Sequence, residues 1–454
     1  MIKQISALAG VVISATAITL LPLGNLQVGT PPAANEFQVQ AKALSLICPG
    51  AAMNSGGANG TSVGSFDRIG AVSISKNSTV GISTTNVGGA TLLSASGATE
   101  QGSAALNAGQ IQNAASARLN GLLGASCQAP GAQHWLLGGD TSTGRETLLL
   151  LSNPSSVPAT VNLEVYAEGG RVQASGLSGI AVSAGETQVV PLSSLIPETR
   201  SFAVQVLSRG ASVGAWLQQR TVRGLLYAGA DFVSPVTEIN KTLSIPGILV
   251  RGAKDAAALI AINDDYKDLI PALRVFNPSD KTATFTAQIF GANEKTFGTV
   301  VRDSIPAHSV KDFEITGLAD GDYAAFISSD AAIAASVRLP RSDKTKKPNT
   351  DFTWLQSAQQ LGDTQQITVP AAGISKLALT NSNNQPVNLT INGVAASIKA
   401  QGTLVVKVSA GAVTLKISDG KVGGNLVVDV SGAITNLALV DYRNSGSRVK
   451  VRVR

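Results

Sequence analysis

Alternating polar and apolar residues recur at three places along the chain and predict strands with one buried face. The apolar positions are two residues apart in each segment: Val161, Leu163 and Val165, then Phe285, Ala287 and Ile289, then Val387, Leu389 and Ile391. Successive side chains of a strand point to opposite faces, so a register shift of one residue would expose every core position. The shared parity therefore predicts the same strand in three copies of one structure.

A turn is expected just before each of these strands. It is headed by Asn153, Asn277 or Asn381, whose side chain can bond to nearby backbone, and a proline follows the first two. A second shared block comes later in each copy: VSAGETQVVPL from Val182, IPAHSVKDFEI from Ile305 and IKAQGTLVVKV from Ile398. This block predicts a strand, a tight turn and another strand.

The spacing of the turns indicates the fold class. Small polar turns are expected again at Ser208, Ser328 and Ser418, before a closing apolar run. Regular turns within units of about 100 residues predict an all-β chain of tandem immunoglobulin-like β-sandwich repeats. We place these repeats at residues 135–240, 241–353 and 354–454.

A divergent β domain is expected before the repeats, at residues 44–134. Its alanine-rich stretch, SAALNAGQIQNAASARLNGLL, is interrupted by Gly and Asn residues and therefore favours strands over a helix. Cys48 and Cys127 are the chain's two cysteines, and both lie in this domain. We expect them to form a disulfide in an oxidising compartment; two unpaired buried thiols are the alternative.

The amino-terminal segment predicts export. Lys3 is followed by no charged residue until Glu36, and residues 5–23 are apolar. About 20 apolar residues cross a bilayer, whereas the apolar region of a cleaved signal has about 7 to 15, so residues 1–24 favour a transmembrane signal anchor over a signal peptide. Residues 25–43, with two prolines, are expected to be a spacer. The rest is expected to be extracytoplasmic on a single-pass membrane protein, or secreted if the segment is cleaved.

Composition and charge narrow the classes of partner. Only 14% of the 454 residues are charged, against about 25% in a typical domain, which fits a β-rich exported protein. The net charge of +6 is concentrated near the carboxyl end, in SRVKVRVR, where valines alternate with cations. We expect an edge strand whose charges discourage aggregation; contact with an anionic polymer is the alternative, through Arg448, Lys450, Arg452 and Arg454. Nucleic acid is not expected, because no basic stripe contains interleaved aromatic residues.

Groups suited to catalysis are few, and no catalytic, cofactor or metal site is expected. His308 occupies a turn position, and His134 has no second histidine at metal-ligand spacing, so both are interpreted as structural. Asp140 lacks the glycine that an aspartic-protease signature requires at Ser142, and is interpreted as a loop residue.

Three other patterns are interpreted as structural. GTSVG around Ser62 and GASVG around Ser212 match a nucleophile elbow by chance, since no helical pattern follows either. The acidic run DAAALIAINDDYKD lacks calcium-loop spacing and is expected to be a solvated loop or strand end. The three tryptophans could form a sugar-stacking platform, but core or interdomain packing is favoured: Trp135, Trp216 and Trp354.

Several motifs together resemble a known family. ICPG around Cys48, HWLLGG around Trp135, and the related LLLLSNPSSVPATV and LRVFNPSDKTATF are similar to a family of actinobacterial membrane-anchored envelope proteins with an uncharacterised repeated β domain. The third copy departs from the pattern because no proline follows Asn381. The resemblance implies an envelope location and supplies no catalytic residue.

The sequence thus favours a noncatalytic, membrane-anchored envelope protein that presents β-sandwich modules for scaffolding or adhesion. Its expected partner is another envelope protein or a cell-wall polymer. One alternative is a module that binds wall polysaccharide. Another is an envelope enzyme of unrecognised type that acts on glycans through paired carboxylates about 5 to 10 Å apart.

Overall fold

The computed structural model describes residues 34–39, 43–56, 64–95, 104–116, 118–292, 298–343, 349–444 and 447–452. Strands account for 64% of it and helices for 5%, so the predicted all-β class is confirmed. The chain separates into two compact units, residues 41–445 and a smaller unit of residues 1–40 with 446–454. In the smaller unit, β1 (Ala34–Val39) pairs antiparallel with β36 (Ser447–Arg452). The expected anchor, residues 1–24, lies outside the described residues, in which no helix is long and apolar enough to cross a membrane.

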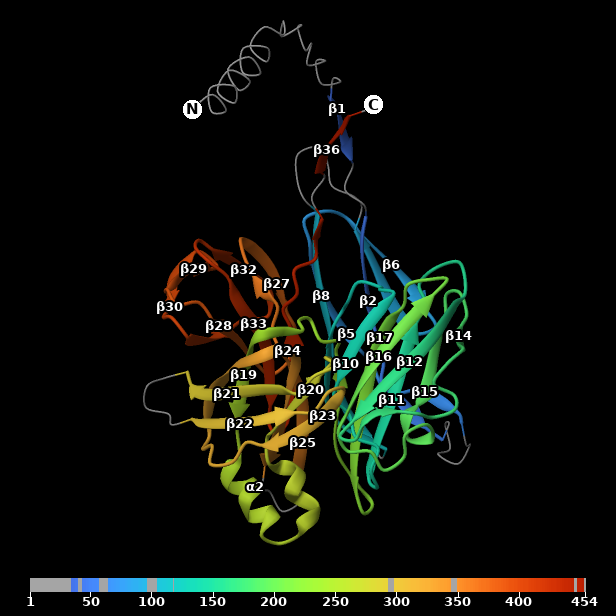
Figure 1. The fold of residues 1–454 in the computed structure, drawn as a ribbon, viewed down its shortest axis with the longest axis vertical. Coiled ribbons are helices and arrows are strands. Elements are labelled where there is room, and N and C mark those ends of the chain that lie inside the picture. Colours follow the sequence, from blue (N-terminus) through green and yellow to red (C-terminus); the bar gives the residue numbers. More distant parts are fainter. Residues whose placement is uncertain are drawn as a thin grey trace, which may run out of the picture. The chain divides into compact units, whose positions relative to one another are not determined.

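Within the larger unit, the three copies share one topology of antiparallel strands in two sheets (Figure 1). The first copy consists of β10 (Gln133–Leu137), β11 (Arg145–Ser152), β12 (Ala159–Ala167), β14 (Ile180–Val182), β15 (Thr187–Pro191), β16 (Phe202–Arg209), β17 (Gly214–Arg223) and β18 (Leu226–Val233), with the short β13 (Gly170–Val172) and the 3₁₀ turn η1 (Leu192–Ser194). The second consists of β19 (Asn240–Val250), β20 (Ala272–Asn277), β21 (Ala283–Gly291), β22 (Thr299–Ile305), β23 (Ser309–Glu314), β24 (Gly321–Asp343) and β25 (Asn349–Gln356). The third consists of β27 (Thr364–Val369), β28 (Ile374–Asn381), β29 (Val387–Ile391), β30 (Val394–Ile398), β31 (Gly402–Val408), β32 (Gly411–Ile417), β33 (Val422–Val430) and β34 (Ala433–Ala438), with β26 (Gln360–Leu361) beside β33.

The pairing rules are the same in each copy. In the first, β11 pairs with β15 and β17 while β12 pairs with β14 and β16; β20 and β21 repeat this in the second copy, and β28 and β29 in the third. Each pair of sheets encloses a hydrophobic cluster. Eight of the nine residues of the predicted apolar parity lie in these clusters, and Ile391 is partly buried against the third. The alternation therefore predicted both the strands and their buried face. The predicted repeat limits, at residues 135–240, 241–353 and 354–454, stay predictions as domain boundaries.

The buried asparagines confirm the predicted corners. Asn277 Nδ2 donates to the carbonyl oxygens of Lys281 (2.7 Å), Ile305 (3.0 Å) and Pro306 (3.1 Å), and its Oδ1 accepts from Ser279 N (3.0 Å). Equivalent contacts hold the other two copies: Asn153 with Val157, Val182 and Ser155, and Asn381 with Gln385, Ile398, Lys399 and Asn383. One side chain thus joins the start of the third strand to the end of the fourth in every copy.

Two expectations for the second copy are wrong. No turn interrupts the chain at Ser328; instead β24 continues through it and changes partners, from β19 and β21 to β20 and β25. The acidic run is not a loop or strand end but folds as α2 (Ala253–Ile260) and the 3₁₀ helix η2 (Asp264–Leu269). Asp320 favours this helix by accepting hydrogen bonds from Gly252 N (3.1 Å) and Ala253 N (2.8 Å) at its first turn.

The region before the repeats is also β-structured. It contains β2 (Leu44–Cys48), β3 (Met53–Ser55), β4 (Phe66–Arg68), β5 (Ser73–Ser78), β6 (Ile82–Val87), β7 (Ala90–Ala95), β8 (Ala104–Ser116) and β9 (Leu119–Ser126), and β35 (Arg443–Asn444) pairs with β8. The alanine-rich stretch forms β8 and β9, as predicted. Cys48 at the end of β2 and Cys127 just after β9 form the predicted disulfide, with their Cα atoms 4.3 Å apart.

Four strands meet at a buried junction in the larger unit: β9, β18, β25 and β34. β9 is the last strand of the region before the repeats, and β18, β25 and β34 are the last strands of the first, second and third copies. Side-chain hydrogen bonds connect these four strands, which do not pair with one another as a β ladder in the described residues. Asp351 on β25 accepts from the backbone N–H groups of Leu122 in β9 (2.9 Å), Ala230 in β18 (3.1 Å) and Ile434 in β34 (3.1 Å). One carboxyl group therefore hydrogen-bonds all three neighbouring strands.

Asp231 on β18 likewise hydrogen-bonds the other three strands. It accepts from Gly124 N in β9 (2.8 Å), Thr353 Oγ1 in β25 (2.5 Å) and Thr435 Oγ1 in β34 (2.9 Å). Burial raises the pKa of Asp351 to about 7, and burial likewise raises the pKa of Asp231 well above its usual value. The two carboxyl groups fix four parts of the chain to one another.

Candidate functional site

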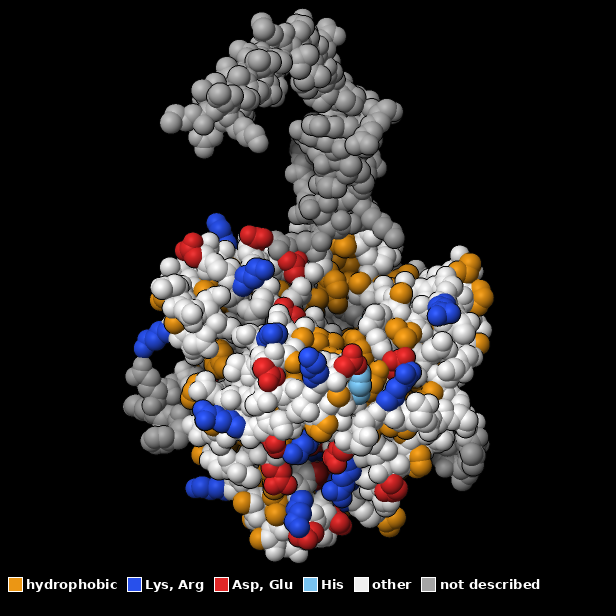
Figure 2. Space-filling view, viewed as in Figure 1, with side chains coloured by type: hydrophobic (Ala, Val, Ile, Leu, Met, Phe, Trp, Pro, Cys, Tyr) orange, Lys and Arg blue, Asp and Glu red, His pale blue; other side chains and the backbone are white. Residues whose placement is uncertain are grey.

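The residues predicted to contact a polyanion lie in the smaller unit or beyond it. Arg448, Lys450 and Arg452 belong to β36, which pairs with β1, and Arg454 lies outside the described residues. Their role stays a prediction. On the face of the molecule seen in Figure 2, the basic and acidic side chains of the larger unit are intermixed, without a broad patch of one sign.

Each histidine lies close to an oxygen acceptor in the structure. His134 is largely buried, its Nε2 lies 2.7 Å from the Val213 carbonyl oxygen, and burial lowers the pKa of the imidazole. His308 occupies a turn with φ 54°, and its Nε2 lies 2.8 Å from Asp280 Oδ1. Among the described residues, neither histidine is hydrogen-bonded to a serine, threonine or cysteine side chain.

The other sequence patterns also have local explanations. Asp140 Oδ1 accepts from Ser142 N (2.8 Å) and Ser142 Oγ (2.6 Å), which is a loop-stabilising turn. Ser212 precedes the strand β17 rather than a helix, and Ser62 lies outside the described residues. Among the described residues there is no group of three or more His, Cys, Asp or Glu placed to hold a metal.

The tryptophans pack instead of forming an exposed platform. Trp216 and Trp354 are buried, and Trp354 Nε1 donates to Gln219 Oε1 (2.6 Å). The ring of Trp135 lies 5.1 Å from Phe276 and 5.8 Å from Tyr166 between centroids, so it joins the first and second copies. The packing interpretation is confirmed for these three residues.

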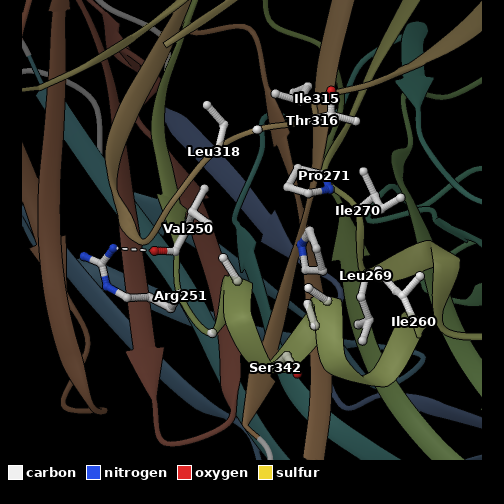
Figure 3. Close-up of a pocket in the computed structure, with 16 residues that line it drawn as sticks. Val250, Arg251, Ile260, Leu269, Ile270, Pro271, Ile315, Thr316, Leu318 and Ser342 are labelled. Atoms are coloured by element: carbon white, nitrogen blue, oxygen red, sulfur yellow. Dashed lines mark hydrogen bonds between the residues drawn. The ribbon is translucent and has the colours of Figure 1, made fainter. Parts of the chain in front are cut away.

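A cavity of about 220 Å³ lies between the helical insertion and the β-sandwich of the second copy (Figure 3). Its walls come from the end of β19, from α2, from the chain between η2 and β20, from the loop after β23 and from β24. The residues that line it are almost all apolar or small: Val250, Arg251, Gly252, Ala253, Ala256, Ala257, Ile260, Leu269, Ile270, Pro271, Ile315, Thr316, Gly317, Leu318, Pro340 and Ser342. Ala257, Thr316 and Gly317 are exposed and mark its opening.

Ser342, in β24, is one of the residues that line the cavity. Ser342 is 2% exposed, and its Oγ has no hydrogen-bond partner among the described residues. Pro340 and Ser342 both line the cavity and are two residues apart in β24, so their side chains share a face. The sequence did not indicate this site, although the run AAALIA has the apolar spacing of a short helix.

Charge pairing holds the insertion to the sandwich. Asp268, at the end of η2, accepts from Arg145 Nη2 (2.9 Å) in β11, from Arg338 Nη2 (3.3 Å) in β24, and from Arg223 in β17. Burial opposes ionisation of Asp268, but the guanidinium groups of Arg338, Arg223 and Arg145 outweigh it and lower the pKa of its carboxyl group. The cavity wall is therefore anchored to the first copy as well as to the second.

The fold and the cavity define a class: a β protein built from three copies of one two-sheet topology, with a helical insertion in the second copy that covers an apolar hollow. Residues 82–418 match the model of DUF5719, a family of unknown function, and the chain belongs to this family. No curated protein matches the chain. No solved structure matches it either.

Proposed function

We propose that this chain is a noncatalytic, membrane-anchored envelope protein of the actinobacterial type, which presents three immunoglobulin-like β-sandwiches outside the cytoplasm for scaffolding or adhesion. Residues 1–24, with the apolar stretch 5–23, are its proposed anchor, and residues 25–43, which include β1, are the proposed spacer.

The junction of β9, β18, β25 and β34 is the observation that supports this proposal most. Asp231 and Asp351 bond four parts of the chain together, and residues 41–445 form one compact unit. A scaffold benefits from such cross-links, because each removes a hinge between modules that would otherwise move independently. The pairing of β36 with β1 would also hold the basic carboxyl-terminal segment near an anchored end.

Fractionation of cells that express the full chain tests the anchor. We expect the protein in the membrane fraction, with residues 1–24 retained, and cleaved by a protease added outside the cell. A mature chain recovered from the medium that begins beyond residue 24 would contradict the anchor.

Polysaccharide binding is a second candidate, favoured by one feature of the first copy. A polar hollow of about 450 Å³ is lined in part by Thr143, Glu168, Glu198 and Arg200. Glu198 has φ 51°, a left-handed conformation that is costly for residues other than glycine and that occurs often at functional sites. Its carboxylate accepts from Thr143 Oγ1 at 2.8 Å, while Glu168 is exposed.

Co-sedimentation of the full chain with purified, protein-stripped cell wall separates the two candidates. A scaffold that binds a protein partner stays in the supernatant. Pelleting that persists in high salt and is lost in Glu168→Ala supports the polar hollow. Pelleting that salt abolishes, and that Glu168→Ala leaves unchanged, indicates the cationic segment of β36 instead.

A further inference from the structure

We propose that Arg68 binds a carboxylate that carries an apolar group, such as the free carboxyl end of a peptide with an apolar last residue. The site is an open hollow of about 510 Å³, lined by residues of β3, β4 and β15 and by the turn between β6 and β7. This inference assigns a ligand class and does not depend on the proposed scaffolding role.

Arg68, in β4, is half-buried and has no acidic partner among the described residues. Seven other arginines, with side chains 2% to 23% exposed, each pair with an aspartate or glutamate. Arg68 instead donates to backbone carbonyl oxygens, from Nη1 to Pro49 and Ala51 (2.8 Å each) and from Nη2 to Gly88 (3.1 Å). Burial lowers the pKa of its guanidinium to about 10, so the group stays charged at neutral pH without a counter-ion. An anion that pairs with it recovers part of the cost of burying that charge.

The backbone around Arg68 holds the guanidinium and leaves its Nε uncovered. Gly50 and Gly89 have positive φ; a Cβ atom on Gly89 would lie 2.1 Å from Arg68 Nε, and one on Gly50 would lie 2.7 Å from Nη1. Nε makes none of the three hydrogen bonds of the guanidinium, and it is not among the unpaired nitrogen atoms that the fold buries. Because Arg68 and Gly89 both line the hollow, the Nε–H group can donate to an oxygen placed there.

The rest of the lining determines what the carboxylate is attached to. Met53, Phe66 and Val189 supply apolar surface, and Arg68 is the one charged residue among the described lining residues. A hydrocarbon group beside the carboxylate gains from leaving water at this surface. A polyphosphate or another polyanion would need further cations, which this lining does not provide.

Two acidic residues close to the hollow also favour a ligand with a single negative charge. Asp67 precedes Arg68 in β4, where successive side chains point to opposite faces. Glu186 is exposed, and its Oε2 lies 2.8 Å from the place that a Cβ atom on Gly88 would take. Neither pairs with Arg68, but each repels a second negative charge on the ligand.

The test uses the full chain in lipid nanodiscs, with empty nanodiscs as the blank. ¹⁹F NMR titrations measure the dissociation constants of N-trifluoroacetylvaline, of its neutral amide and of trifluoroacetate, which lacks the apolar group. We expect N-trifluoroacetylvaline to bind about tenfold more tightly than the amide, as one hydrogen bond to a charged group predicts, and more tightly than trifluoroacetate. A fluorinated isovalerate distinguishes the source: equal affinity assigns the site to small free acids, and weaker binding assigns it to peptide ends.

Charge variants locate the site without touching the hydrogen bonds of Arg68. Gln188→Glu places a negative charge in the hollow and should weaken binding of the acid severalfold, whereas Gln173→Glu makes the same change at an exposed position outside it and should not. Glu186→Gln should strengthen binding. Arg68→Met should remove the preference for acid over amide, with the melting temperature as the check on folding.

Three results would overturn the proposal. The first is an acid that does not bind the wild-type chain, and the second is equal affinity for the acid and its amide. The third is equal affinity of Gln188→Glu and Gln173→Glu for the acid, which would place any binding elsewhere on the chain.

Discussion

At the scale of single residues, the side chain of one asparagine in each copy makes several hydrogen bonds to the backbone. Asn153, Asn277 and Asn381 are fully buried, and each satisfies backbone carbonyl groups from two segments. A buried carbonyl group without a hydrogen-bond donor costs free energy, so each corner requires a side chain that can donate to these carbonyl groups. The sequence revealed these corners because the turn and its asparagine are adjacent in the chain.

Asn277→Ala should therefore destabilise the second copy. The change removes the donor shared by Lys281, Ile305 and Pro306, and we expect a loss of about 3 kcal/mol in the free energy of unfolding, measured by urea denaturation. Asn384→Ala, at an exposed position, is the control and should stay within about 0.5 kcal/mol of wild type. Equal midpoints for the two variants would contradict the role of the corner.

Asp268 is a second residue whose removal should be costly. Asp268→Asn leaves Arg145, Arg223 and Arg338 close together without their counter-ion, and we expect a loss of about 3 kcal/mol by thermal unfolding. Asp264→Asn breaks an ion pair whose carboxylate is 79% exposed and should have little effect. Because the pKa of Asp268 is lowered in the folded chain, its contribution is present above the usual aspartate pKa and is lost as the pH falls below it.

At the scale of elements, the sequence predicted strands well and their boundaries less well. Period-two alternation identified β12, β21 and β29 with the correct buried face, because that pattern is local. The prediction of a turn at Ser328 failed. Polar residues are typical of a turn, but here they lie where the continuous strand β24 passes from one sheet to the other. The prediction for α2 failed because the stabilising Asp320 lies far along the chain.

Packing of β9 against β34 supplies a prediction at this scale. A Cβ atom at Gly124 would lie 2.4 Å from Thr435 Oγ1 and 3.2 Å from the Asn436 carbonyl oxygen. Gly124→Ala should separate the two strands and lower the melting temperature by several degrees. Gly81→Ala is the matched control, because a Cβ there meets nothing within 4 Å. A melting temperature equal to that of Gly81→Ala would show that the junction is loosely packed.

At the scale of the whole molecule, the sequence predicted the all-β class, the repeated pattern and the disulfide, but not the junction. Asp351 and Leu122 are 229 residues apart, and Asp231 and Gly124 are 107 apart. No local pattern distinguishes these aspartates from exposed ones. The cavity was missed for a similar reason, since its lining comes from four separate segments of the chain.

The junction makes the stability of the larger unit depend on pH in a defined direction. An unfolded aspartate releases its proton near its usual pKa of 3.8, whereas burial raises the pKa of Asp351 to about 7 in the folded chain. Between these values the folded chain holds a proton that the unfolded chain has lost, so the stabilisation is complete below about pH 4 and declines as the pH rises to about 7. Asp231, whose pKa is also raised by burial, adds to the same trend.

Melting temperatures measured from pH 4 to pH 8 test this. We expect a fall toward pH 7 in the wild-type chain and a shallower fall in Asp351→Asn, which has no proton to lose at that position. His134 acts in the opposite sense as the pH rises toward its usual pKa of 6.5, because burial lowers its pKa in the folded chain. The slope of the variant is therefore compared with that of the wild type. A slope unchanged by Asp351→Asn would mean that this carboxyl group is already ionised at the junction, stabilised by its three backbone N–H donors.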